Sequence, residues 1–206
     1  MRANVLGTVA GLETMRGDFD RARAAYEEAA ALFSELGLRM PLAGLTQVGV
    51  PLELAAGDAQ AAEREARRGY EIIAAAGLGA IQAPLLAETL LAQGRHEEAG
   101  QVLGEPGVDA PRLPPWQVKW RTVRARLDLA AGRPEGAVER ASEAVELAGA
   151  TDDPTLHGEA LQTLAEALAA AGRWREAEAA AAEAARRLQA KGHAAARRRP
   201  LAPAST

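Results

Sequence analysis

The chain of 206 residues contains no cysteine, and aromatic residues make up only 3% of it. Without cysteine, disulfides and thiolate metal sites are excluded. No apolar run reaches the roughly 18–20 residues that a membrane-spanning helix needs. The short apolar start, ended by Glu13, makes a poor signal peptide, so we expect a cytoplasmic protein that does not enter the membrane. Valine, isoleucine and aromatics are too sparse for a sheet, whereas the dominant alanine, leucine, glutamate and arginine favour helices.

The sequence also lacks motifs of catalysis and of metal or cofactor binding. It has no phosphate-binding glycine–lysine loop and no nucleophile elbow around a serine. Its histidines, His96, His157 and His193, do not have the spacing of metal ligands, and we expect His96 to be a packing residue. The acidic pair ending at Asp153 precedes Pro154, which is typical of a helix cap. We therefore expect no enzyme, cofactor or metal, and the net charge of −4 disfavours nucleic acid.

What the sequence does have is a repeat, marked by glycines spaced 40, 37, 38 and 40 residues apart. These glycines are Gly17, Gly57, Gly94, Gly132 and Gly172. An alanine follows each of them by five residues: Ala22, Ala62, Ala99, Ala137 and Ala177. Glycine permits the positive φ of a turn between two helices, and alanine permits two helices to approach closely. The pattern predicts five helix–turn–helix repeats.

A second register supports this interpretation. The residues seven positions before the turn glycines are small: Ala10, Val50, Ala87, Ala125 and Ala165. Small residues at matched heights bring helix axes to the short end of the usual 8–10 Å range. We therefore predict an all-α protein, a right-handed α-solenoid of about five repeats over residues 1–192. The predicted repeats span residues 1–40, 41–79, 80–114, 115–152 and 153–192, and Asp18 and Asp58 are predicted to cap helices.

Residues 105–115 break the pattern, because four prolines among them cannot continue the second helix of the third repeat. This segment is either an ordered loop after a shortened helix, a hinge between the first three and last two repeats, or a loop that gates a ligand. Residues 193–206, which include three consecutive arginines, are expected to form a disordered basic tail.

The combined pattern resembles the tetratricopeptide repeat (TPR). That family places a small residue on the first helix, glycine at the turn, alanine five residues later and often another small residue seven beyond it. The last position is met by Ala29, Gly69, Ala144 and Ala184 and fails at Pro106. The departures are a period of 37–40 residues instead of 34 and the absence of the usual large aromatics. The resemblance implies a scaffold that binds a protein or peptide on a concave face lined by the first helices.

Residues 12–23, 120–126 and 172–177 also resemble the carboxy-terminal helical region of multidomain bacterial ATPase regulators, in particular those with an adenylate/guanylate cyclase domain. This resemblance implies an interaction or sensing module of a bacterial signalling or transcriptional regulator. The chain would then be the non-catalytic end of such a protein or a free-standing relative.

The TPR resemblance also implies which positions face a ligand, namely those thirteen, ten, six and three residues before each turn glycine. The count places these polar residues, among others, on that face: Asn4, Gln47, Glu88, Lys119, Thr122, Arg126, Glu159, Gln162 and Glu166. In one interpretation Arg126 pairs with Glu88 or Glu166 in a partly solvated network of little functional weight. In the other, Lys119 and Arg126 clamp a carboxylate of a peptide or of a small acidic ligand.

Other features leave further alternatives open. Trp116 and Trp120 share a helical face, where they either pack in the core or, for Trp116, contact a partner. A pocket around Glu88, Arg126 and Glu166 would suit a small-molecule enzyme, and a basic stripe would suit a nucleic-acid-associated regulator. The first helix lacks a polar cap, so an upstream domain or a second copy is expected to cover it. The isolated chain is then either a homodimer or least stable at its first repeat.

Overall fold

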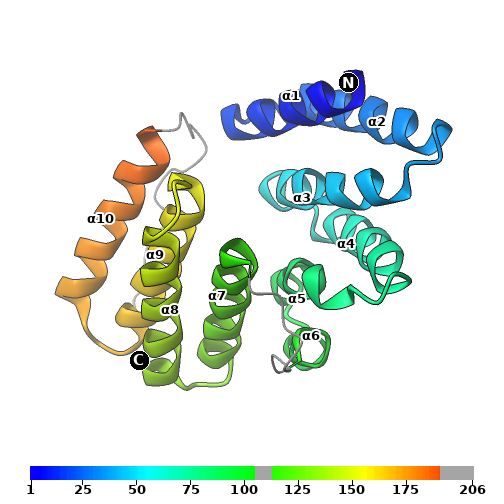
Figure 1. Ribbon diagram of the computed structural model, residues 1–206. Coiled ribbons are helices and arrows are strands. Elements are labelled where there is room, and N and C mark those ends of the chain that lie inside the picture. The colour runs from blue at the N-terminus through cyan, green and yellow to red at the C-terminus, as the bar shows by residue number, and fades with distance from the viewer. Residues whose placement is uncertain (105–112, 191–206) are drawn as a thin grey trace. The chain divides into compact units, whose positions relative to one another are not determined.

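The computed structural model describes residues 1–104 and 113–190, and in these ranges the chain forms ten α-helices, one 3₁₀ turn and no strand (Figure 1). The helices are α1 (Arg2–Arg16), α2 (Phe19–Glu35), α3 (Arg39–Ala55), α4 (Ala59–Ala74), α5 (Ala83–Ala92), α6 (His96–Leu103), α7 (Pro114–Ala130), α8 (Pro134–Gly149), α9 (Pro154–Ala170) and α10 (Trp174–Ala190), with the 3₁₀ turn η1 at Gly79–Ile81. The chain divides into two compact units, an N-terminal unit (Met1–Gly104) and a C-terminal unit (Glu105–Thr206).

In the N-terminal unit, each helix from α1 to α6 packs against the next one along the chain. The first helices of successive repeats also touch, α1 against α3 and α3 against α5. The C-terminal unit repeats this arrangement, because α7 to α10 pack in sequence and α7 also contacts α9. Within each unit, therefore, every repeat buries its apolar face against its neighbours, as in a stacked helical repeat.

The predicted turns and caps are confirmed. All five turn glycines have left-handed backbone with φ between 70° for Gly132 and 84° for Gly57. Asp58 Oδ1 accepts a hydrogen bond of 2.8 Å from the backbone N–H of Ala61 at the start of α4. Asp18 and Asp153 cap α2 and α9 in the same way, so side-chain carboxylates satisfy N–H groups that a helix start leaves unpaired.

The predicted small-residue seams are confirmed as well. The alanines five residues after the turn glycines, Ala22, Ala62, Ala99, Ala137 and Ala177, have no exposed surface. On the facing first helices, Ala10, Val50, Ala87 and Ala125 are also fully buried, and Ala165 is 2% exposed. The two registers therefore mark the two sides of each helix–helix contact.

Several boundaries differ from the prediction by a few residues. The second repeat begins at Arg39, so Pro41 lies in the first turn of α3, where a missing N–H costs nothing. The 3₁₀ turn η1 precedes α5 and was not predicted. Helix α6 ends at Leu103, shortened as expected. The predicted hinge falls mostly on residues 105–112, and the predicted tail on 193–206, both outside the described residues. One continuous solenoid over residues 1–192 stays a prediction.

None of the described helices is long and apolar enough to cross a membrane.

Candidate functional site

The C-terminal unit brings four of the predicted ligand-facing residues together as two pairs between α7 and α9. Lys119 Nζ lies 2.9 Å from Glu159 Oε2, and Arg126 Nε lies 3.9 Å from Glu166 Oε2. All four side chains are 27–37% exposed. Each pair joins residues that are 40 positions, one repeat, apart. We call these four residues the charge ladder. The predicted pairing of Arg126 with Glu166 matches this geometry.

Two other predicted residues of the C-terminal unit behave differently. Gln162 is half-buried on α9, between the two acidic residues of the ladder. Thr122 is only 4% exposed, and its hydroxyl donates a 2.8 Å hydrogen bond to the carbonyl of Val118. Its assignment as a ligand-facing residue is therefore corrected, because a buried and internally bonded hydroxyl is not presented to a partner.

In the N-terminal unit the predicted polar positions do not form a cluster of charges. Gln47 is exposed on α3 and donates a 3.1 Å hydrogen bond to the side-chain oxygen of Gln82. Gln82 is buried and donates in turn to the carbonyl of Ala43 at 3.2 Å. Glu88 is half-buried on α5. Gln47 thus takes part in the packing between the second and third repeats.

The N-terminal unit instead has an open, mostly apolar groove between α1 and α3, with a cavity of about 460 Å³. We call it the α1/α3 groove. It is lined by Asn4, Gly7, Thr8, Gly11, Leu12 and Met15 of α1, by Pro41, Gly44, Leu45 and Val48 of α3, and by Phe33 of α2. The α1 residues recur at helical spacing, so they form one stripe along the helix that faces a similar stripe on α3.

Three glycines line this groove. At one of them a side chain would clash with a neighbour, and at the other two it would not. A Cβ on Gly7 would lie 2.9 Å from Leu45 Cδ1, so Gly7 permits close packing. A Cβ on Gly11 would only touch Val48 at 3.9 Å, and one on Gly44 would meet nothing within 4 Å. All three occupy ligand-facing repeat positions. Sequence reasoning missed the groove because it sought polar side chains there, although glycine inside a helix, which costs about 1 kcal/mol, was a usable signal.

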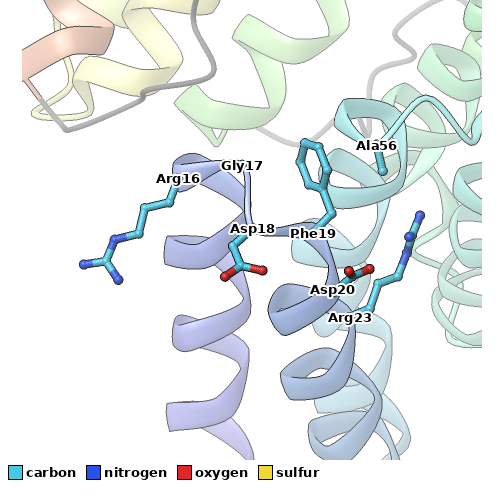
Figure 2. A pocket seen from close by; sticks show the side chains of 7 residues that line it. All are labelled: Arg16, Gly17, Asp18, Phe19, Asp20, Arg23 and Ala56. Atoms are coloured by element: carbon cyan, nitrogen blue, oxygen red, sulfur yellow. The ribbon is translucent and has the colours of Figure 1, made fainter.

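A second cavity lies at the first turn, between the end of α1, the start of α2 and Ala56 (Figure 2). Its arginines do not converge, since Arg16 and Arg23 point to opposite sides in Figure 2. Arg23 is bound to Glu53 through Nε and Nη2 at 2.9 and 2.6 Å, and this hydrogen bonding and charge raise the pKa of Arg23. The cavity therefore lacks a convergent set of groups that could hold a ligand.

A charged network around Glu63 joins the second and third repeats. Glu63 lies 2.7 Å from Arg67 Nη2 and 2.6 Å from Arg95 Nη1, and it accepts a 2.7 Å hydrogen bond from Gln93. Burial alone would raise the pKa of Glu63, but the hydrogen bonds from Gln93, Arg67 and Arg95 lower it below its usual value. The carboxylate therefore stays ionised and links α4 to the start of α6.

The aromatic and histidine expectations have mixed outcomes. Trp120 is 7% exposed and packs in the core, although its indole N–H is buried with no acceptor among the described residues. Trp116 is half-buried. His96 is exposed, so the expectation that it is a packing residue is wrong.

The comparisons with known proteins give a fold but no family. No family model matches the chain, and no curated protein matches it in sequence. A structure of nearly identical kinesin light chain-type TPR-like repeats from Podosopora anserina is 19% identical with a TM-score of 0.55. The match covers 94% of this chain and 97% of that one. BtubC from P. vanneervenii is 22% identical with a TM-score of 0.52, over 98% of this chain and 84% of its own. The fold is that of an α-solenoid of TPR-like helical repeats.

Proposed function

We propose that this chain is a non-catalytic scaffold that binds a protein or peptide segment on the face formed by the first helices of its repeats. The observation that carries the proposal is the charge ladder. Its four side chains occupy the positions that face ligands in TPR proteins, and they are half-exposed instead of sealed in the core. Charges held at a surface in a fixed register select a partner by complementarity.

The geometry of the ladder suits a partner that carries a carboxylate. Arg126 lies 3.9 Å from Glu166 and its side chain is 27% exposed, so a ligand carboxylate can reach the guanidinium from solvent. A planar guanidinium binds a carboxylate through two parallel hydrogen bonds. Lys119 adds a second positive charge two helical turns away, next to Glu159. A segment from a protein or a small acidic ligand would use the same two basic groups.

The wider setting is part of the same proposal. The stretches that resemble bacterial ATPase and cyclase regulators favour an interaction or sensing module of such a cytoplasmic regulator, with the partner on a concave face. The exposed apolar side chains of α1, Val5, Val9 and Leu12, favour a role of the first repeat in contacts with an adjoining domain or a second copy.

A capture experiment with reversed charges tests the proposal. The full chain is compared with R126E/E166R, which reverses one pair of the ladder while keeping the net charge. R121E/E143R is the matched control, because Arg121 and Glu143 form an inter-helix pair of 2.7 Å between α7 and α8. We expect proteins captured from a bacterial lysate by the native chain and the control to be lost from R126E/E166R. Equal capture by all three folded proteins contradicts a site at the ladder.

A further inference from the structure

We infer that the α1/α3 groove binds a short polypeptide segment that carries two or three large apolar side chains with carboxylates at both ends. This inference rests on the proposed function and names the partner chemistry for the N-terminal unit. It follows from three properties of the groove: its apolar lining, the space that its glycines leave, and the sign of the charges around it.

Exposed large apolar residues are most frequent in the first repeat, and one of them, Leu12, lines this groove. Ten large apolar residues are exposed, and seven of them lie in the first 40 residues: Met1, Val5, Val9, Leu12, Leu36, Leu38 and Met40. Leu12 is 47% exposed and lines the groove, and Met40 is 48% exposed beside Pro41 of the lining. The apolar lining of the groove, in which Leu12 is exposed, is therefore suited to contact with apolar side chains of a partner.

The groove is open because glycine stands where a side chain would fit without a clash. Gly44 lies inside α3, is exposed, and would place a Cβ in empty space. Alanine there would favour the helix by about 1 kcal/mol. Gly11 of α1 also lines the groove, and a Cβ there would lie at ordinary contact distance from Val48. Packing among the described residues thus does not require glycine at either position, and the absent side chains leave this space open to an occupant.

The exposed charged residues of α1 and α3 are all positive. The structure describes every residue of both helices, and their exposed charged residues are Arg2, Arg16 and Arg39. The two carboxylates, Glu13 and Glu53, are largely buried and lie against arginines. Arg2 pairs with Glu28 of α2 and Arg16 with Glu13, yet these arginine side chains remain 74% and 66% exposed.

The arginines lie at the ends of the two helices. Arg2 begins α1, Arg39 begins α3, and Arg16 ends α1. The N-cap of α3, Leu38, offers no side-chain acceptor, so the first N–H groups of α3 add positive potential at that end. Although Arg2 and Arg16 each pair with a glutamate, their guanidiniums are exposed and can also meet carboxylates of a bound segment. An apolar groove with arginines at its ends is thus complementary to an apolar segment with carboxylates at its ends.

The length of the groove limits the size of the segment. From Asn4 to Met15 the lining of α1 extends about 16 Å, at 1.5 Å per residue. This is about three turns of helix or about five residues of extended chain. In a helix-in-groove arrangement, such a length presents anchors at positions i, i+4 and i+7.

Charge also argues against a second copy of α1 as the occupant. That helix would bring Arg2 and Arg16 toward the same arginines of the first copy, in either direction of pairing. Like charges that face each other destabilise an interface. An acidic segment has no such repulsion.

The test uses three fluorescein-labelled synthetic peptides of 14 residues, a length of about four helical turns. The first has leucines at helical spacing and two glutamates at each end, the second has lysines at the ends, and the third is a scramble of the first. We expect the full chain to bind the first peptide saturably, as measured by fluorescence anisotropy. The peptide with lysine ends and the scramble are expected to bind at least about tenfold more weakly.

Variants then place the binding in the groove. Gly44→Leu fills the groove from an open position and is expected to weaken binding of the first peptide about tenfold or more. Gly100→Leu is the matched control, because a Cβ on Gly100 in α6 also meets nothing within 4 Å, and it should bind as the native chain does. Arg39→Glu should weaken binding of the acidic peptide and narrow its advantage over the peptide with lysine ends.

Three outcomes overturn the inference. The first is absence of saturable binding of the acidic peptide up to about 1 mM. The second is equal binding of the acidic and basic peptides. The third is a native dimer that Gly44→Leu converts to a monomer, since a second copy would then occupy the groove. R126E/E166R should still bind the acidic peptide. A negative peptide test therefore does not contradict binding at the charge ladder, and a negative capture experiment does not contradict peptide binding in the α1/α3 groove.

Discussion

The two units use the same repeat positions for opposite chemistry. Thirteen and six residues before the turn glycine, the C-terminal unit has Lys119 and Arg126 on α7, paired with acidic residues of α9. In the N-terminal unit, the position six before the first turn glycine is Gly11 and the position thirteen before the second is Gly44, and these two glycines leave an apolar groove. The repeat register thus sets the backbone, while the side chains on the first-helix face vary without disturbing the buried seams.

Both units have small-residue seams within their repeats, and the N-terminal unit adds a polar contact between its first two repeats. In the C-terminal unit the contact between α7 and α8 is built from alanines such as Ala125 and Ala137. In the N-terminal unit, Gly49 makes room for the ring of Tyr26, whose hydroxyl donates to Glu65 at 2.5 Å and accepts from Arg68 at 2.9 Å. Burial and the hydrogen bond to Glu65 raise the pKa of Tyr26, so its hydroxyl remains a donor at neutral pH.

The largest effect is expected from Gly49→Ala in the N-terminal unit. The new Cβ would lie 2.5 Å from the hydroxyl oxygen of Tyr26, which the pair Glu65 and Arg68 holds in place. We expect a loss of about 3 kcal/mol in the free energy of unfolding, measured by urea denaturation. Gly44→Ala in the same helix should instead gain up to about 1 kcal/mol. Equal effects of the two substitutions would contradict the distinction between packing and groove glycines.

A somewhat smaller loss is expected from Ala137→Leu in the C-terminal unit. Ala137 is fully buried in a cluster with Ala125 and Ala165, where a larger side chain forces the helices apart. The expected cost is about 2 kcal/mol, with faster hydrogen exchange in α7 and α8. Ala179→Leu, at an exposed position of α10, is the control and should leave stability almost unchanged. A stable Ala137→Leu protein would show that this seam tolerates wider spacing.

Acidification should act on the N-terminal unit through Glu63. Because its pKa is lowered in the folded chain, Glu63 contributes stability above the usual value of 4.5, and this contribution is lost as the pH falls through the folded value. The free energy of unfolding of the native chain, measured by urea denaturation, should therefore drop more steeply below pH 5 than that of Glu63→Gln, with a difference in slope of at most about one proton. Glu139→Gln, exposed on α8 outside this network, serves as the control. Parallel curves for all three proteins would rule out the linkage.

The smallest effect on stability is expected at the charge ladder itself. Half-exposed ion pairs contribute about 0–1 kcal/mol, so R126E/E166R should unfold within about 0.5 kcal/mol of the native chain. Thermal unfolding of the swapped and native chains measures this difference. A loss of several kcal/mol would mean that the ladder is a structural network and would remove the basis for its role in binding.

The sequence predicted the repeat architecture because turns and seams depend on single residues with few alternatives. Gly17 and its four counterparts have a positive φ, which favours glycine, and alanines such as Ala22 are fully buried where two helices meet, which favours a small residue. Because few residue types suit either position, both features can be recognised in a single sequence. The surface was harder to predict. Thr122 is at a ligand-facing position by count, but it is buried and its hydroxyl is bonded to the carbonyl of Val118. The α1/α3 groove was missed because its main evidence is the absence of side chains at Gly11 and Gly44.

The alanine seams have a thermal consequence. An alanine side chain loses no rotamer entropy on burial, but it also removes little apolar area from water. The heat capacity of unfolding scales with that apolar area, at about 12–15 cal/mol/K per residue in ordinary globular proteins. A chain whose helix contacts rest on Ala22, Ala62, Ala99, Ala137 and Ala177 should fall below this range. Its stability curve is then shallow, so that cooling weakens the fold less than it weakens a protein with a leucine-rich core.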